Sequence, residues 1–123
     1  MSKGKILLVD DETDVLDAVK KRLEANDYEV ITAQDGEMAL NKAREENPDL
    51  IILDLMLPKL DGYKVCRLLK FDSKYEDIPI IMFTARGEES DEKLGSEVGA
   101  DAYIVKPFEP EALLSKVEEL TNK

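Results

Sequence analysis

The chain has 123 residues, 43% hydrophobic and 37% charged, a mixture that favours one packed domain over residues 1–123 and argues against a disordered tail. Its formal net charge of -11 argues against direct binding of nucleic acid or anionic membrane, because both require clustered Lys and Arg. The single cysteine, Cys66, excludes an internal disulfide. The apolar runs are too short to span a bilayer, and the N-terminus does not resemble a secretion signal. We therefore expect a cytoplasmic protein.

Five short apolar runs predict β-strands. They span Ile6–Val9, Tyr28–Ala33, Leu50–Leu53, Ile78–Phe83 and Ala102–Val105. Four of them are nearly continuous in large apolar residues, as expected of parallel strands that helices cover on both faces. The run Tyr28–Ala33 is more polar, so we expect it at an edge of the sheet.

Amphipathic segments between the runs predict helices. Their apolar faces comprise Val15, Leu16, Val19 and Leu23, then Ala39, Leu40 and Ala43, then Val65, Cys66 and Leu69, and finally Leu113, Leu114, Val117 and Leu120. We expect Cys66 to be a small buried hydrophobe and Pro110 to be the first residue of the last helix. The segment 88–98 has few large apolar residues and contains Gly95, so its helix should be the least firmly held.

The alternation of strand and helix predicts an α/β fold. The economical topology is a doubly wound (βα)5 three-layer sandwich of flavodoxin-like type with a parallel five-stranded sheet. The strand order 2-1-3-4-5 follows by analogy with other doubly wound sheets. Ligands of such sheets bind beyond the carboxyl ends of the strands, so that edge is where functional residues are expected.

Polar residues follow the buried runs where the strands are expected to end. Asp10 and Asp11 follow the first run, Asp54 the third, Thr84 the fourth and Lys106 the fifth. If the first and third strands are neighbours, their ends lie roughly 5 Å apart. Asp10, Asp11 and Asp54 would then form a carboxylate cluster, and a hard divalent cation would relieve the repulsion within it. Mg²⁺ fits this donor set best.

The residue types at this edge limit the chemistry to carboxylate, hydroxyl and ammonium groups. The chain contains no histidine, which excludes a Ser-His-Asp triad and a histidine-ligated zinc site. A carboxylate can attack phosphorus and form an acyl phosphate where a metal and positive charge neutralise the transferring oxygens. Asp54 would be the nucleophile beside Mg²⁺, with Lys106 and Thr84 binding the other phosphoryl oxygens.

Taken one at a time, the same residues have purely structural explanations. Asp11 alone is better explained as the N-cap of the first helix, Thr84 as a strand-end hydroxyl, and Tyr103 as core packing. Asp54 alone suits a solvated turn, and Lys106 a surface charge. Only the joint placement of these residues favours a functional site.

In its motifs the chain resembles the receiver domains of two-component response regulators, over essentially its whole length. The motif set comprises Asp10-Asp11-Glu12, then Asp54 with Met56, Pro58, Asp61 and Gly62, then Thr84-Ala85, and finally Lys106-Pro107-Phe108. Each motif alone is weak, but their order and spacing together are specific. The resemblance implies that Asp54 is the phosphoacceptor, that Asp10 and Asp11 serve the metal, and that the backbone carbonyl of Met56 completes its coordination.

The resemblance also implies a switch and its partners. Thr84 would move toward the phosphoryl group and Tyr103 would turn inward, which changes the face built by the fourth predicted helix, the fifth strand and the last helix. The Lys106–Pro107 peptide bond is cis in the family. A sensor histidine kinase or a histidine phosphotransfer protein would supply the phosphoryl group. A downstream effector protein would read the altered face, and this face could also pair two copies on phosphorylation.

Two other functions compete with a phosphoacceptor switch. A phosphatase of the haloacid dehalogenase type also uses a strand-end aspartate with Mg²⁺, but it needs a second Asp two residues on, where this chain has Met56. A pseudo-receiver would be an interaction module with a relict acid cluster, which the intact Asp54, Thr84 and Lys106 oppose. We therefore expect a signalling domain, not an enzyme, that catalyses only its own phosphorylation and dephosphorylation.

Overall fold

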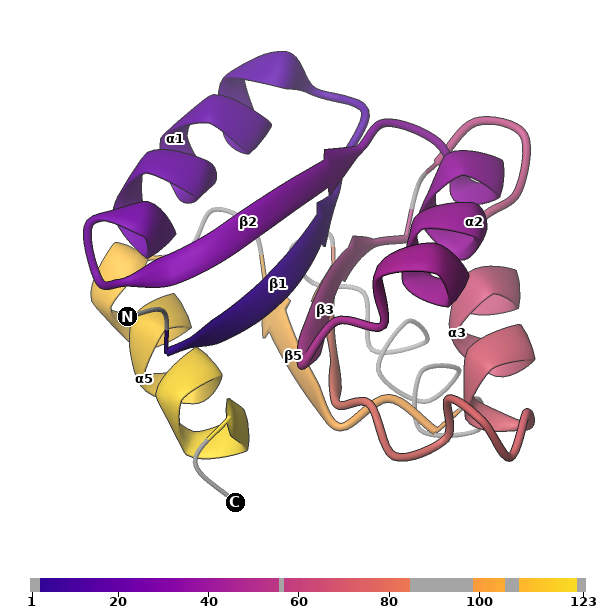
Figure 1. Ribbon diagram of the computed structural model, residues 1–123. Coiled ribbons are helices and arrows are strands. Elements are labelled where there is room, and N and C mark those ends of the chain that lie inside the picture. The colour runs from indigo at the N-terminus through magenta and orange to yellow at the C-terminus, as the bar shows by residue number, and fades with distance from the viewer. Residues whose placement is uncertain (1–2, 56, 85–98, 106–108, 122–123) are drawn as a thin grey trace.

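The computed structural model describes residues 3–55, 57–84, 99–105 and 109–121, with only the backbone of Thr84 (Figure 1). The predicted helix over 88–98 lies outside the described residues, and so do Met56, Lys106 and Pro107.

A parallel five-stranded sheet forms the centre of the molecule, in the predicted order β2-β1-β3-β4-β5. Its strands are β1 (Gly4–Val9), β2 (Tyr28–Ala33), β3 (Leu50–Asp54), β4 (Ile80–Thr84) and β5 (Ala102–Val105). The more polar β2 lies at one edge, as its composition predicted. The predicted start of the fourth strand at Ile78 was wrong by two residues, because the Ile78 amide closes a turn by donating to the Tyr75 carbonyl at 3.1 Å, and Pro79 has no N–H.

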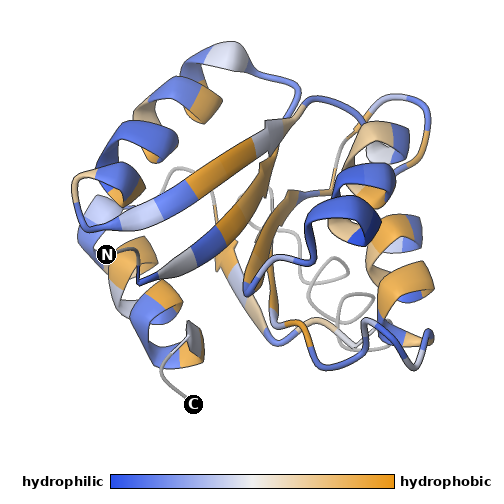
Figure 2. Ribbon diagram, in the orientation of Figure 1, coloured by the Kyte–Doolittle hydropathy of each residue, from blue (hydrophilic) through white to orange (hydrophobic). Residues whose placement is uncertain are grey.

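Helices cover both faces of this sheet. In Figure 1, α1 (Thr13–Glu24) and α5 (Pro110–Thr121) lie on one face, and α2 (Gly36–Glu46) and α3 (Gly62–Lys70) on the other. Alternate residues of β1 serve the two layers, since Ile6 and Leu8 pack toward α1 and α5 while Leu7 and Val9 pack toward α2 and α3. Figure 2 shows the hydrophobic residues concentrated on the central strands. The three-layer α/β arrangement predicted from the sequence is confirmed.

The helix termini show how the chain turns between layers. The side chains of Asp35 and Asp61 cap α2 and α3 by accepting from backbone amides three residues on, at 2.8 and 3.0 Å. Pro110 is the first residue of α5, as predicted. The N-cap of α1 is Glu12, without a side-chain capping bond, so the explanation of Asp11 as that cap was wrong.

One ion pair ties α3 to the amino ends of β4 and β5, at the edge opposite the strand-end acids. Lys70 Nζ lies 2.7 Å from Asp101 Oδ2 and also donates to the carbonyl oxygens of Ile78 at 2.7 Å and Glu76 at 3.2 Å. Asp101 Oδ2 in turn accepts from the Ile80 amide at 2.8 Å. Only 11% of the Lys70 side chain is exposed, so this charge is largely removed from solvent.

Within the described part of the chain, no helix is both long enough and apolar enough to cross a membrane.

Candidate functional site

The carboxyl ends of β1 and β3 bring acidic side chains together. Val9 and Leu53 are register partners in the parallel pair, so the residues that follow them, Asp10 and Asp54, lie side by side at the edge of the sheet. Both side chains belong to residues that are almost fully buried, Asp10 at 0% and Asp54 at 6% exposure. A buried carboxylate is costly unless it is hydrogen-bonded, paired or bound to a cation, which sets these two apart from the exposed acids of the surface.

Four carboxylates form the resulting cluster. Each of Asp10, Asp11, Glu12 and Asp54 offers an oxygen, and these oxygens all lie within 4.8 Å of one another. Asp11 and Glu12 are exposed, so the cluster is buried on one side and open on the other. Glu12 was recognised in the sequence as part of the acidic motif but was not predicted to be a ligand. The turn after β1 explains the position of Glu12, because its amide donates to Asp10 Oδ1 at 3.0 Å. This bond holds Glu12, the N-cap of α1, beside Asp10.

The donor set of this cluster fits Mg²⁺. Carboxylate oxygens are hard ligands, and Mg²⁺ in proteins is usually held by one or two carboxylates while water fills its remaining positions. The open side formed by Asp11 and Glu12 leaves room for such water, and the buried side fixes two oxygens in place. Four like charges this close repel one another, and a shared divalent cation removes that repulsion.

The first residue of α3, Gly62, packs directly against the end of β3. A Cβ on Gly62 would overlap the carbonyl oxygen of Asp54 and would lie 2.9 Å from Leu55 Cα. The Gly62 amide also donates to the Leu55 carbonyl at 3.0 Å, and the Leu55 amide donates to Phe83 in β4. Gly62 therefore allows α3 to hold the backbone on which Asp54 is carried.

The loop between β3 and α3 is held a second time, by the start of α2. The Gly36 amide donates to the Pro58 carbonyl at 3.2 Å, and a Cβ on Gly36 would lie 2.6 Å from Leu60 Cβ. Lys59, which has a positive φ of 67°, places its ammonium 3.8 Å from Asp35 Oδ2 at the N-cap of α2. Two helix starts thus enclose the loop that follows Asp54. The sequence marked Gly62 as a motif member, but no periodic or compositional signal predicted the contact of Gly36.

The remaining predicted site residues are described only in part. The backbone of Thr84 ends β4, which neighbours β3, so Thr84 lies at the same edge as Asp54. Tyr103 pairs in register with Met82, is partly buried, and packs against the apolar layer beneath α2 and α3. Lys106 and Met56 lie outside the described residues, and Lys106 follows β5 directly in sequence.

Cys66 does not contribute a nucleophile. It is fully buried on the inner face of α3. This burial raises the pKa of the thiol to about 12, a shift that Asp101 reinforces and Lys70 opposes. A thiol with so high a pKa is protonated at neutral pH and chemically inert. The expectation of a small buried hydrophobe is confirmed.

Comparison with known proteins gives one consistent family. The family model described as "Response regulator receiver domain" matches residues 6–118. The alkaline phosphatase synthesis transcriptional regulatory protein PhoP of Bacillus subtilis is 49% identical over 97% of this chain and 49% of its own length. The phosphate regulon transcriptional regulatory protein PhoB of Klebsiella pneumoniae is 42% identical over 97% of this chain and 52% of its own length.

Solved structures agree with these matches. The chemotaxis response regulator CheY4 of Vibrio cholerae superposes with a TM-score of 0.89 at 36% identity, covering 98% of each chain. The match covers nearly all of that solved chain, but this chain spans about half the length of the curated relatives that it matches.

Proposed function

Because the chain belongs to the response regulator receiver domain family of two-component signalling, we propose that it is a phosphorylatable switch with Asp54 as its phosphoacceptor. The observation that carries this proposal is the convergence of Asp10, Asp11, Glu12 and Asp54 within 4.8 Å at the carboxyl edge of the sheet. The phosphoryl donor would be a sensor histidine kinase or a histidine phosphotransfer protein, and residues 1–123 would act as one domain in the cytoplasm.

The chemical step is a phosphoryl transfer to a carboxylate. An oxygen of Asp54 attacks the phosphorus of a phosphohistidine, the new P–O bond forms as the P–N bond breaks, and the histidine of the donor leaves with the electron pair. The backbone of Asp54 is held by the end of β3 and by the contact of Gly62. This fixed position supports in-line attack, because a nucleophile that does not reorient keeps the entropic cost of the step low.

The acidic neighbours of Asp54 would hold Mg²⁺, with the backbone carbonyl of Met56 as a further ligand. When bound, the ion supplies positive charge to the phosphoryl oxygens. Asp10 is fully buried and accepts from the Glu12 amide, so it is oriented before any ligand arrives. Asp11 is exposed at the mouth of the cluster, where it can adjust to the incoming group.

Two further residues would bind the transferred group and start the switch. We place Lys106 and Thr84 on the remaining phosphoryl oxygens. This is supported by Thr84 as the last residue of β4 and by Lys106 as the residue that follows β5 in the sequence. Tyr103 is only partly buried against the layer beneath α2 and α3, and it would turn inward as Thr84 moves. This movement of Thr84 and Tyr103 would alter the face that includes β5 and α5. The Lys106–Pro107 peptide bond beside this face would be cis. The altered face would pair two copies of the phosphorylated chain.

The output of the switch would be a protein contact. The net charge of -11 opposes direct binding of this chain to DNA. The relatives named above as transcriptional regulatory proteins are about twice as long as this chain. The effector would be a further part of the same polypeptide, as the length of these relatives suggests, or a separate protein. Turnover of external phosphate esters is not part of the proposal, because position 56 holds Met instead of a second Asp.

Intact-mass analysis after incubation with acetyl phosphate and Mg²⁺ tests the proposal. We expect the wild type to gain the mass of one phosphoryl group, and the Asp54→Asn variant to gain none. Asp77→Asn is the matched control, because Asp77 is an exposed acid outside the cluster. Phosphorylation of the Asp54→Asn variant, or phosphorylation of the wild type that EDTA does not reduce, would refute the assignment of acceptor and metal site.

A further inference from the structure

The outer side of α3 carries an exposed mixture of apolar and basic side chains. Lys64, Arg67, Leu68 and Phe71 are spaced at i, i+3, i+4 and i+7, so they form one stripe along two turns of the helix. We call these four residues the α3 face. All four are exposed, with Leu68 at 46% and Phe71 at 73% of their full accessible surface. Phe71 is the most exposed large hydrophobic residue among those described.

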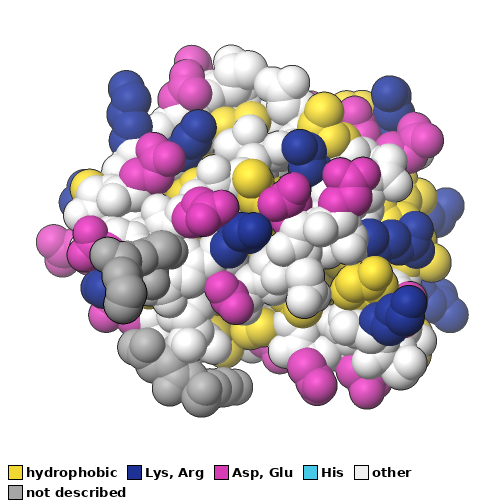
Figure 3. Space-filling view, in the orientation of Figure 1, with side chains coloured by type: hydrophobic (Ala, Val, Ile, Leu, Met, Phe, Trp, Pro, Cys, Tyr) yellow, Lys and Arg dark blue, Asp and Glu magenta, His cyan; other side chains and the backbone are white. Residues whose placement is uncertain are grey.

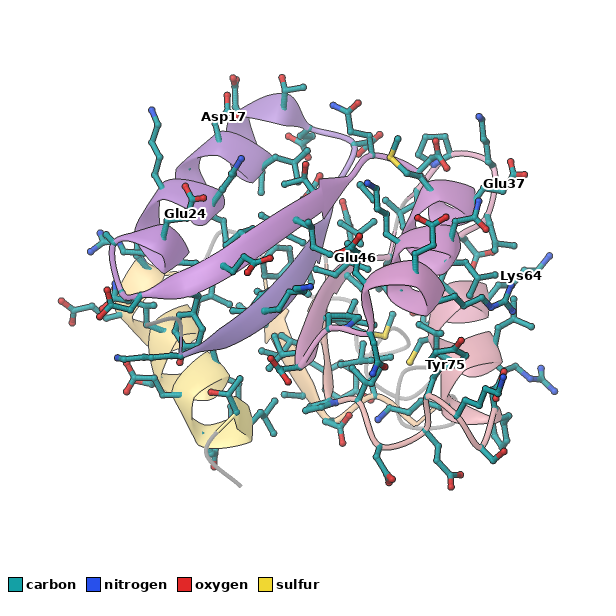
Figure 4. All side chains as sticks on the ribbon, viewed as in Figure 1. Asp17, Glu24, Glu37, Glu46, Lys64 and Tyr75 are labelled. Carbon is teal, nitrogen blue, oxygen red and sulfur yellow. The ribbon has the colours of Figure 1, made fainter. Side chains whose placement is uncertain are left out.

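The charge of the α3 face is opposite to that of the chain. The whole molecule has a formal net charge of -11, yet the two polar members of this face are both cations. Neither Lys64 nor Arg67 forms an ion pair with another described residue. Figure 3 shows Lys and Arg side chains interspersed with hydrophobic ones on the side of the molecule where α2 and α3 lie. In Figure 4 the labelled Lys64 reaches outward from α3, away from the sheet.

We propose that the α3 face is a docking surface for an acidic amphipathic helix of a partner protein. The convex ridge of Leu68 and Phe71 would pack between apolar residues of the partner helix, as helix surfaces do when ridges fill grooves. Glu and Asp side chains at the borders of that helix would pair with Lys64 and Arg67. Phe and Arg are both enriched at protein–protein interfaces relative to the rest of the protein surface.

Other occupants fit the α3 face less well. Two copies related by a twofold axis would bring the same cations to face each other, which repels. A nucleic acid or an anionic membrane needs a larger basic cluster than two cations to overcome the net charge of the chain. A protein helix satisfies both the apolar centre and the basic border.

Fluorescence polarisation with a labelled synthetic helix tests this surface. The helix carries leucine on one face and glutamate along both borders of that face. We expect saturable binding that weakens as salt rises, because the charge pairs are screened. Phe71→Ala should weaken binding about tenfold, and the double variant Lys64→Glu/Arg67→Glu should remove the salt dependence as well. The same helix with lysine in place of glutamate should not bind.

Matched controls separate the α3 face from the rest of the surface. Lys21→Glu/Arg22→Glu makes the same charge change at exposed positions of α1 and should leave the affinity within about twofold. Asp54→Asn should bind the helix as tightly as the wild type, so this test is independent of the phosphoacceptor assignment. The docking proposal would be overturned by absence of binding to the glutamate helix, by equal weakening in the α1 variant, by self-association through Phe71, or by preferential binding to anionic vesicles.

Discussion

Replacement of Gly62 by alanine tests whether α3 positions Asp54, the proposed phosphoacceptor. The added Cβ would overlap the carbonyl oxygen of Asp54 and would approach Leu55 Cα to 2.9 Å, whereas ordinary van der Waals contact begins near 3.4 Å. The atoms that it meets are backbone atoms of β3 and the residue after it, so no side chain can rotate away. Either α3 must move outward or the end of β3 must move inward.

The expected cost of this substitution follows from overpacking. Extra methylene groups in a tightly packed site cost about 1–3 kcal/mol, and the gain in helix propensity from Gly to Ala returns at most about 1 kcal/mol. We expect the free energy of unfolding to fall by about 2 kcal/mol, because backbone relaxes less readily than side chains. A shift of Asp54 by a fraction of an ångström should also slow its phosphorylation by about tenfold or more.

Urea unfolding and the rate of phosphorylation by acetyl phosphate measure the two effects. Gly99→Ala is the matched control, because Gly99 has a positive φ of 89° but a Cβ there would meet Lys70 no closer than 3.4 Å. We expect Gly99→Ala to lose about 1 kcal/mol through backbone strain and to keep the wild-type rate. Our reasoning is refuted if Gly62→Ala unfolds and reacts like the wild type, or if Gly99→Ala slows phosphorylation equally.

Three further predictions concern the metal, the ion pair and the thiol. Mg²⁺ at ten times its dissociation constant should raise the free energy of unfolding of the wild type by about 1.4 kcal/mol, measured by thermal unfolding. The Asp11→Asn variant should lose most of this stabilisation. An equal stabilisation of the variant by Mg²⁺ would exclude Asp11 as a ligand. Lys70→Met should lower the free energy of unfolding, measured in urea, by about 2 kcal/mol, because Asp101 is left without its cation. A loss below about 0.5 kcal/mol would show that water solvates Asp101 as well as Lys70 does. The pKa of Cys66 is raised to about 12 from 9.0, so only the unfolded state ionises between these values. The stability of the wild type relative to Cys66→Ala should therefore be constant below pH 9 and fall by about 2 kcal/mol near pH 10.5, and parallel curves would contradict the burial effect.

The sheet could be predicted from the sequence because its signals are local. Nearly continuous apolar runs identify β1, β3, β4 and β5, and the polar positions of β2 identify an edge strand. The start of β4 could not be predicted, because the apolar residue Ile78 belongs to a turn whose hydrogen bond no apolar pattern reveals. Order within the sheet came from analogy with other doubly wound folds and was correct.

The acidic cluster was predictable in outline, since parallel strands that are neighbours must place Asp10 and Asp54 at one edge. Glu12 was missed as a possible ligand because its position depends on the tight turn after β1 and not on strand register. The contact of Gly36 with the loop after β3 was also missed, because it joins two segments far apart in the sequence. Tertiary contacts of this kind leave no periodic pattern in either segment.

The two edges of the sheet differ in how their charged side chains are arranged, and this difference affects how a switch can operate. At the amino edge, Lys70 neutralises Asp101 within the chain and locks α3 to β4 and β5. At the carboxyl edge, four carboxylates of the same sign converge, so the local energy there depends on what binds. A charged ligand or a phosphoryl group that binds the cluster therefore changes the local energy at the carboxyl edge, while the Lys70–Asp101 ion pair and the buried residues of β1 and β3 keep the fold intact.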